Sequence, residues 1–273
     1  MSTTNVLPAA WSAVRVPAHP GAAGESARLL WRLAMALALV ALPTAVGLAL
    51  DDRRLGHFNV WSKPLKFQLA LALQAATLAW ALGHLSPALR RIAMPRSLAI
   101  GWSIVAVYEA GFITLQGARG VASHFNRATP WESIGATLMA SGAGVLVLVT
   151  VWMGLVALWQ ARQQRWAVMP LAIGLGFVGG GVLAAWTGGA MGAVRGYWPE
   201  PLVEPVQWMP VTGWVLSQTD LRIAHFVGLH QMQMLPAIAA AGVLARWQPR
   251  VLRATICAAC LVAIAAVLVL RTS

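Results

Sequence analysis

The chain has 273 residues, of which 59% are hydrophobic and only 10% are charged. Soluble domains carry roughly 25% charged residues, so this composition excludes an ordinary water-soluble protein and indicates one that exposes apolar surface to lipid. The formal net charge of +12 does not indicate nucleic-acid binding, because the basic residues lie in short groups between long apolar runs and no nucleic-acid-binding motif is present.

Seven apolar stretches are long enough to cross a bilayer, which takes about 20 residues of helix. In chain order they are Leu29–Leu50, Phe67–Leu85, Ser97–Gly117, Ser133–Leu158, Val168–Gly188, Leu221–Ala245 and Ala254–Leu270. Helix is predicted for each of them, because a lone strand in lipid would leave its backbone groups unpaired. The predicted fold class is therefore all-α, a polytopic transmembrane helical bundle of about seven helices that forms one domain over residues 29–270.

The segments between the predicted helices indicate an orientation. Residues 1–28 contain several Pro and Gly residues and are expected to form a flexible cytoplasmic tail. The loops 86–96, 159–167 and 246–253 all contain Arg and fall on the same side of a seven-helix bundle. Because loops rich in Lys and Arg stay in the cytoplasm, the N-terminus is predicted in the cytoplasm and the C-terminus outside. The Arg-rich, Lys-poor composition favours a bacterial protein of the inner (plasma) membrane.

Small residues and prolines mark two features within the helices. Gly176 and Gly180 form a small-xxx-small pair in the fifth helix, which would let another helix approach closely. Pro43 and Pro236 lie inside the first and sixth helices. Each proline removes an intrahelical hydrogen bond and is expected to kink its helix.

The dipeptide His-Phe occurs three times, each time near the outer end of a predicted helix, and its histidines are His57, His124 and His225. Neutral imidazoles bind Zn, Cu and Fe, so these three residues are candidate ligands of a metal site that keeps an open position. Alternatively, two of them could clamp a haem. His230, deeper in the sixth helix, is a candidate cofactor-binding residue. The competing interpretation for each histidine is an interfacial or buried side chain that only hydrogen-bonds its neighbours.

Charged residues within membrane helices are candidate functional groups, because burying them in lipid is costly. Glu109 lies inside the third helix, with Gln116 seven positions on and therefore on the same face. Asp220 precedes the sixth helix as a cap, and Arg222 follows it. These three charged residues are assigned as catalytic candidates. The two acids would act as acid/base groups or orient a metal ligand, and Arg222 would contact an anion.

Two further features fall on the outer side. Lys63 and Lys66 precede the second helix, where they either extend into the membrane interface or bind anionic lipid or an anionic substrate. The loop 189–220 is long, apolar and rich in Trp and Pro. It is expected to lie on the membrane surface and to cover the outer opening of the bundle.

Three functions are compatible with this pattern. The first is a membrane-embedded metal- or haem-binding protein that performs redox or hydrolytic chemistry on a lipophilic substrate such as a lipid or quinone. The second is a proton-coupled transporter in which Glu109, Arg222 and His225 form a binding network. The third is a scaffold subunit of a membrane complex, in which the glycine face of the fifth helix docks a membrane-protein partner. Membrane lipid and a lipophilic or anionic small molecule are the expected partners.

Overall fold

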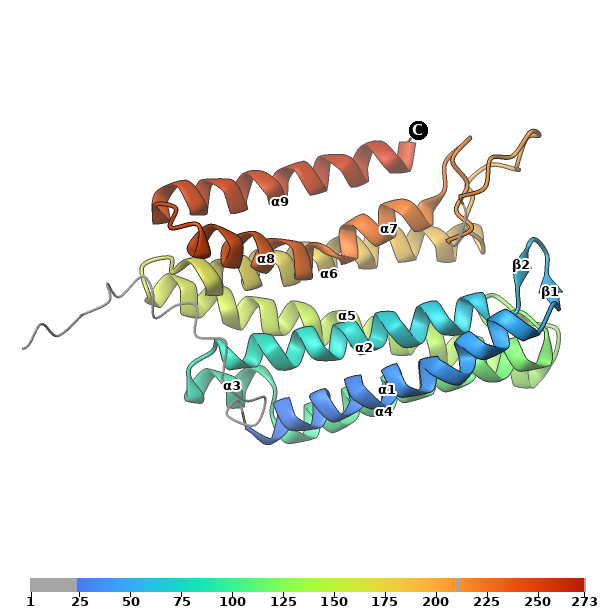
Figure 1. Ribbon diagram of the computed structural model, residues 1–273, viewed down its shortest axis with the longest axis horizontal. Helices are drawn as coiled ribbons and strands as arrows, with labels where there is room; N and C mark the ends of the chain where they lie inside the picture. The colour runs from blue at the N-terminus through green and yellow to red at the C-terminus, as the bar shows by residue number, and fades with distance from the viewer. Residues whose placement is uncertain (1–23, 210–211, 273) are drawn as a thin grey trace, which may run out of the picture.

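The computed structural model describes residues 24–209 and 212–272, which form α-helices and one short β-hairpin (Figure 1). The helices are α1 (Glu25–Leu50), α2 (Ser62–Gly83), α3 (Pro87–Ala93), α4 (Arg96–Arg119), α5 (Pro130–Gln163), α6 (Val168–Val194), α7 (Leu221–Leu229), α8 (Gln231–Leu244) and α9 (Pro249–Thr272). The hairpin pairs β1 (Arg54–Leu55) with β2 (Phe58–Asn59) in antiparallel register. The all-α bundle expected from the sequence is confirmed.

Six helices of the described part are long and apolar enough to cross a membrane, namely α1, α2, α4, α5, α6 and α9. The pair α7 and α8 qualifies together, as a span that is bent by 42°. Residues 24–209 and 212–272 therefore contain six candidate spans, or seven when this bent pair counts as one, in agreement with the predicted number.

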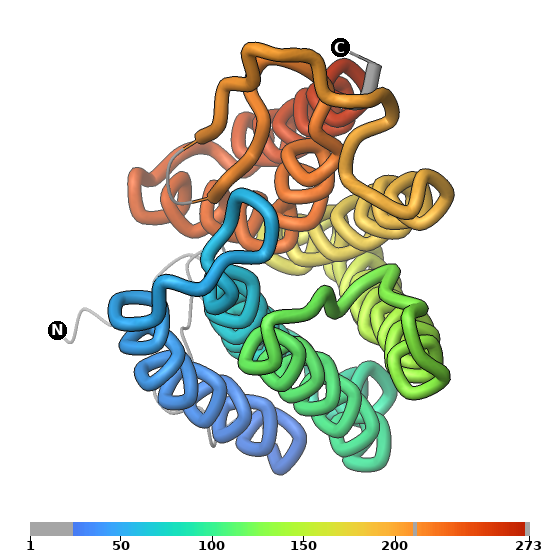
Figure 2. The backbone as a smooth tube through the Cα atoms, turned by 90° about the vertical axis from the view of Figure 1, so that its right-hand side faces the viewer, coloured from blue at the N-terminus to red at the C-terminus, as the bar shows by residue number. Residues whose placement is uncertain are grey.

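The spans form two groups that are joined in the middle. In the view of Figure 2, α1, α2 and α4 lie on one side of the bundle, and α7, α8 and α9 lie on the other. Helix α5 packs on α4 and on α6, and α6 packs in turn on α7, α8 and α9. The helix pair α5–α6 thus connects the two groups.

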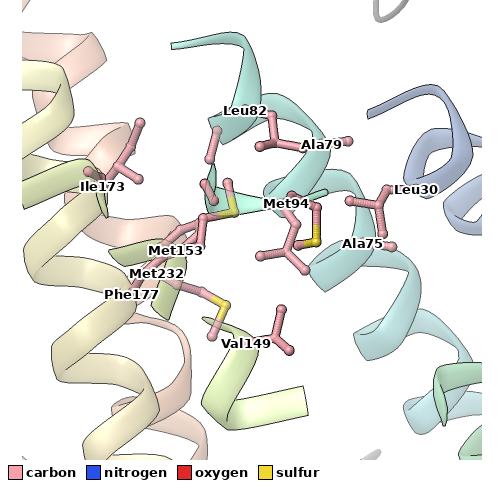
Figure 3. Packing of buried hydrophobic residues seen from close by; sticks show 14 of the residues in the cluster. Leu30, Ala75, Ala79, Leu82, Met94, Val149, Met153, Ile173, Phe177 and Met232 are labelled. Atoms are coloured by element: carbon pink, nitrogen blue, oxygen red, sulfur yellow. The ribbon is translucent and has the colours of Figure 1, made fainter. Parts of the chain in front are cut away.

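The core fills the space between these groups with apolar side chains (Figure 3). Leu30 of α1 and Leu82 of α2 belong to the same buried cluster as Met153 of α5, Phe177 of α6 and Met232 of α8. Because one cluster includes side chains from both groups, the bundle is a single packed unit.

Large apolar side chains also cover the outside of the bundle. Leu42, Ile104, Leu148, Leu261 and Val262, from four different helices, are each at least 63% exposed. A water-soluble protein rarely presents apolar surface on this scale. This apolar outer surface is therefore compatible with a lipid environment.

Several helices are longer than predicted; α2 begins at Ser62, α5 ends at Gln163 and α9 begins at Pro249. Helix α1 begins at Glu25, so the end of the predicted tail 1–28 is helical, and residues 1–23 of that tail lie outside the described residues. Glu25 stabilises this earlier start, because a negative charge is favourable at the positive end of a helix. Helix α6 continues to Val194, which shortens the predicted loop 189–220 to the segment 195–220.

The predicted sixth helix is divided into α7 and α8. Its break lies at His230, whose ψ of −1° ends α7, six positions before Pro236. Pro236 lies inside α8, and Pro43 lies inside α1, which runs without interruption from Glu25 to Leu50. The break between α7 and α8 therefore lies at neither of the two helical prolines, Pro43 and Pro236.

The glycine face of α6 packs against this break. A Cβ atom at Gly176 would lie 2.6 Å from the carbonyl oxygen of Gln231, and one at Gly180 would lie 3.1 Å from the carbonyl oxygen of Leu229. The predicted close approach of another helix is confirmed, and the approaching backbone is that of α7 and α8. The expectation that this face docks a separate partner is wrong, because the chain's own helices occupy it.

Candidate functional site

Three connecting segments meet at one end of the bundle. They are the turn 51–61 with its hairpin, the turn 120–129 between α4 and α5, and the segment 195–220 between α6 and α7 (Figures 1 and 2). The N-terminal end of α2 begins among them. This end of the bundle collects most of the candidate residues predicted from the sequence.

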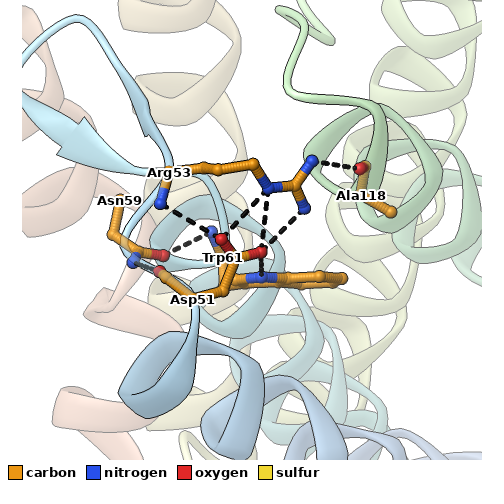
Figure 4. Close-up of polar contacts among 5 residues, drawn as sticks. All are labelled: Asp51, Arg53, Asn59, Trp61 and Ala118. Atoms are coloured by element: carbon orange, nitrogen blue, oxygen red, sulfur yellow. Dashed lines mark hydrogen bonds and ion pairs between the residues drawn. The ribbon is translucent and has the colours of Figure 1, made fainter.

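A network around Asp51 fixes where α2 begins (Figure 4). The Asp51 carboxylate accepts hydrogen bonds from Arg53 Nε at 3.0 Å and from Trp61 Nε1 at 2.8 Å, and Arg53 Nη1 donates to the carbonyl of Ala118 at 2.9 Å. Hydrogen bonds from Arg53 and then from Trp61 hold the pKa of the Asp51 carboxyl well below its usual range. The network connects the end of α1, the start of α2 and the end of α4.

The first turn of α2 has an unusual charge. Its N-cap residue, Trp61, makes no capping side-chain hydrogen bond, and no acidic residue lies in the first turn. Lys63 lies there instead, and Lys66 follows at the start of the second turn. Cations are unfavourable at the positive end of a helix, whereas an anion is favourable there.

The side chain of Lys63 is half-buried among neutral partners. Its Nζ lies 3.0 Å from Nδ1 of His124, donates to the hydroxyl of Tyr197 at 3.4 Å and lies 5.8 Å from the ring centroid of Phe67. Burial, and to a smaller extent the charge of Lys63, lowers the pKa of His124 well below 6.5. The imidazole is therefore neutral, and its Nδ1 accepts from the ammonium group.

Arg222 and Asp220 form an ion pair beside Lys63. Asp220 is buried, caps α7 by accepting from the backbone N–H of Arg222 at 3.0 Å, and accepts from the Arg222 guanidinium. The guanidinium also donates to the carbonyl of Gly213 at 3.0 Å and lies 4.6 Å from the ring centroid of Tyr197. Burial raises the pKa of the Tyr197 hydroxyl, which therefore stays neutral.

These side chains form one unit, because Tyr197 contacts both Lys63 and Arg222. We refer to the unit as the basic cluster, and its members are Lys63, Lys66, His124, Tyr197, Asp220 and Arg222. The Nζ of Lys66 donates to the carbonyl of Thr212 at 2.8 Å. Three cations thus accompany one carboxylate, and that carboxylate is already paired with Arg222.

The basic cluster and the segment beside it have more donors than acceptors. Neither Lys63 nor Lys66 forms an ion pair with a carboxylate in the described part of the chain. The ring of Trp198 lies 5.5 Å from the Arg222 guanidinium, and its Nε1 is buried without a hydrogen-bond partner. The Nε2 of Gln218, in the same segment, is also buried without a partner. An oxyanion would supply the missing acceptors and the missing negative charge.

The three predicted metal ligands lie at this end of the bundle, but they have separate partners. His57 stacks on Trp208 at 4.8 Å between ring centroids, and Nδ1 of His225 lies 2.9 Å from Oγ1 of Thr187. Within the described ranges, no three His, Cys, Asp or Glu side chains are placed to hold a metal ion. The predicted three-histidine site is not assembled. The ammonium of Lys63 occupies Nδ1 of His124, and its charge would also repel a metal cation.

His230 has a local partner as well. Its Nδ1 lies 2.9 Å from the carbonyl oxygen of Phe226, and its ring lies 3.9 Å from the Phe226 ring centroid. Both contacts lie within α7 and its end. The structure places His230 at the helix break, where it packs on the preceding turn.

The polar stripe predicted on the third helix faces the bundle interior. Glu109 is 3% exposed and Gln116 is fully buried. Gln116 accepts from Arg119 and donates to the carbonyl of Ala122. Oε1 of Glu109 is buried and has no hydrogen-bond partner.

Tyr197 and Trp198 were predicted only as part of the outer loop 189–220, and anion binding by Lys63 and Lys66 was one of two interpretations of that pair. The predicted second helix began at Phe67, whereas α2 begins at Ser62, so no signal in the sequence showed that the two lysines lie inside the start of a helix, where cations are unfavourable. Comparisons with protein-family models, with curated proteins and with solved structures found no match.

Proposed function

We propose that the chain is an integral membrane protein that binds the anionic group of a lipophilic small molecule at the basic cluster. One observation carries this proposal, namely the excess of cations over carboxylates in the basic cluster, beside the unpartnered Nε1 of Trp198. A carboxylate, sulfonate or phosphate group would receive charge-assisted hydrogen bonds from the two lysines, which are stronger than bonds between neutral groups.

The surroundings of the cluster suit a ligand with an apolar part. Phe58 and Trp208 pack edge to face at 5.4 Å between ring centroids, and Trp198 lies 6.0 Å from Trp208. Aromatic rings of this kind are favoured at the membrane interface, where one edge contacts lipid and the other contacts water. An amphiphile lying in the bilayer would present its charged head at this depth.

The proposal includes an orientation, with the N-terminus in the cytoplasm and the basic cluster on the outer side of a bacterial inner membrane. The distribution of arginine supports it. Arg90, Arg91, Arg162, Arg165, Arg246 and Arg250 all lie at the end of the bundle opposite to the cluster.

A binding titration tests the proposed function. Purified protein in a non-ionic detergent is titrated with 1-decanesulfonate, an amphiphile of permanent negative charge, while tryptophan fluorescence is recorded. We expect saturable binding of the sulfonate and none of decyltrimethylammonium, the cationic amphiphile of equal chain length. Lys63→Met is expected to weaken binding roughly tenfold or more, because a hydrogen bond to a charged group contributes about 1.5–3 kcal/mol.

The matched control is Arg54→Met, which removes an exposed cation from the hairpin at the same end of the bundle. This variant should bind the sulfonate as the wild-type protein does. Equal binding of both amphiphiles, or an equal loss in the Lys63 and Arg54 variants, would mean that attraction is unspecific and would contradict the proposal.

A further inference from the structure

Helix α2 and the bent pair α7–α8 are linked at two depths of the bundle. At the outer end, Lys66 of α2 and Arg222 of α7 donate to the carbonyls of two adjacent residues in the segment 195–220, at 2.8 and 3.0 Å. Deeper in the bundle, Gln233 of α8 donates to the hydroxyl of Thr77 on α2 at 3.1 Å. The two links are eleven positions apart on both chain segments, which corresponds to about 16 Å of helix.

Between these links the helices do not pack on each other. Helix α2 packs on α1 and α4, α7 and α8 pack on α6 and α9, and no comparable packing joins α2 to α7 or α8 in the described part of the chain.

Exposed apolar side chains lie along the linked faces instead. Leu73 on α2 and Phe226 on α7 are each 44% exposed, and Ala70 on α2 is exposed as well. Each of the three lies four positions from a linked residue, and residues four apart share a face of a helix. These side chains therefore flank a groove between α2 and α7–α8 that is open to lipid. We call it the lateral groove.

The two ends of the lateral groove differ in charge. Its outer end carries the cations of Lys66 and Arg222, which belong to the basic cluster. Its inner end is closed by the neutral pair of Gln233 and Thr77. His230, the polar residue between them on the bent pair, has its ring against Phe226 and its Nδ1 2.9 Å from the carbonyl oxygen of that residue.

We infer that the lateral groove holds the apolar chain of the ligand, so that the ligand is a single-chain amphiphile with an anionic head, which enters sideways from the bilayer. This inference rests on the proposed function. The head lies at Lys66 and Arg222, and the chain points toward Thr77. A decyl chain fits within the distance between the two links.

Charge complementarity selects this occupant over an ordinary neutral lipid. Any lipid chain satisfies the apolar walls, because chains in the bilayer are as apolar as the side chains of the groove. Only an anionic head also pairs with the cations at the outer end, through charge-assisted hydrogen bonds. The head therefore provides most of the affinity, and the groove fixes where the chain lies.

Photochemical cross-linking locates the chain directly. Wild-type protein in a non-ionic detergent is irradiated with 1-decanesulfonate that carries a diazirine on the last carbon of its chain, and the cross-linked peptides are identified by mass spectrometry. We expect cross-links within residues 69–77 of α2 and 226–234 of α7 and α8. An excess of unmodified 1-decanesulfonate should suppress them, whereas decyltrimethylammonium should not.

A pair of variants tests the groove without changing any charge. Ala70→Trp places an indole in the groove, and we expect it to weaken binding of 1-decanesulfonate about fivefold or more, as overpacking of an occupied site does. Binding of ethanesulfonate, whose chain is too short to fill the groove, should stay unchanged. The matched control is Ala265→Trp, which makes the same change at an exposed position of α9 and should bind both sulfonates as the wild type does.

The outcomes separate the two proposals. Absence of saturable sulfonate binding to the wild-type protein would overturn the proposed function and the inference with it. Saturable binding with cross-links spread over the lipid-facing surfaces of α1 and α9, or confined to the segment 195–220, would overturn the inference alone. An Ala70→Trp variant that binds 1-decanesulfonate as tightly as the wild type would do the same.

Discussion

Asp51 shows how one carboxylate can position a site that it does not touch. Its bonds to Arg53 and Trp61 hold the residue that precedes α2, and therefore the first turn that contains Lys63. The pKa of Asp51 is lowered by these bonds. A group with a lowered folded-state pKa stabilises the fold above its unfolded pKa, about 3.9 for Asp, and this contribution is lost as the pH falls.

Asp51→Asn is therefore expected to lower the melting temperature in detergent at pH 7. The difference from the wild-type protein should shrink as the pH falls below about 4, because the wild type then loses the same contribution. The matched control is Asp52→Asn, which changes the adjacent, exposed acid. An equal effect of both variants would show that the network around Asp51 does not hold α2.

His84 gives a second prediction at the scale of single residues, and here the titrating group is a base rather than an acid. It follows α2, its ring lies 4.3 Å from that of Trp80, and its Nε2 is buried without a partner. Burial, and then the charge of Arg90, lowers the pKa of His84 to about 4. The unfolded chain, with a pKa of about 6.5, binds the proton first, so the stability falls as the pH drops from about 6.5 to about 4.

His84→Gln should remove on the order of 1–3 kcal/mol of this pH dependence. Melting temperatures measured between pH 7.5 and pH 4.5, roughly the window set by the two pKa values, should fall less steeply in the variant. An unchanged slope would mean that the His84 ring becomes protonated without cost in the folded protein.

Some features of single residues could be predicted from the sequence, and others could not be predicted from it. The cap at Asp220 and the burial of Glu109 with Gln116 follow from local spacing and from the cost of charge in lipid. The contact of Lys63 with His124 joins positions 61 residues apart, and its contact with Tyr197 joins positions 134 residues apart. No local pattern encodes such a meeting, which explains why the three histidines were grouped with one another rather than with a lysine.

At the scale of elements, the pairing of α6 with the α7–α8 break makes a direct prediction. Gly176→Ala would place a Cβ atom 2.6 Å from the carbonyl of Gln231, and backbone cannot move aside as a side chain can. We expect a loss of stability of about 1–3 kcal/mol, typical of an overpacked interface. Thermal melting in detergent would measure it.

Gly189, on the same helix, is the control. A Cβ atom there meets nothing within 4 Å, and Ala is a better helix former than Gly by up to about 1 kcal/mol. Gly189→Ala should therefore leave the melting temperature unchanged or raise it slightly. Equal destabilisation by both substitutions would mean that the close approach of α7 and α8 does not depend on glycine.

Element prediction succeeded where hydropathy decides and failed where backbone geometry decides. The long apolar runs fixed the number of spans to within the ambiguity of one bent pair. The short helix α3, the hairpin β1–β2 and the break at His230 carry no hydropathy signal. The break depends on the close packing of its backbone on α6, whereas α3 begins with a local cap, in which Ser86 accepts from the backbone N–H of Leu89.

For the whole molecule, the orientation proposed above can be tested by chemical labelling. In a protein whose Cys257 and Cys260 are replaced by Ala, one new cysteine is placed at either end of the bundle: Glu200→Cys in the segment 195–220, and Gln164→Cys in the turn after α5. Both positions are exposed. A membrane-impermeant maleimide should label the first in intact cells and the second only after the membrane is opened. The reverse pattern would place the basic cluster in the cytoplasm.

The segment 195–220 has one more consequence for the affinity of this site. Tyr197, Thr212 and Gly213 each offer an oxygen to a cation of the basic cluster. These oxygens are intramolecular competitors, so an arriving anion must displace them before it gains its own contacts. Substitutions that weaken the contacts of the segment 195–220 with these cations should therefore tighten ligand binding, whereas loss of the two lysines should abolish it. The sequence of this segment thus sets the ligand concentration at which the site fills.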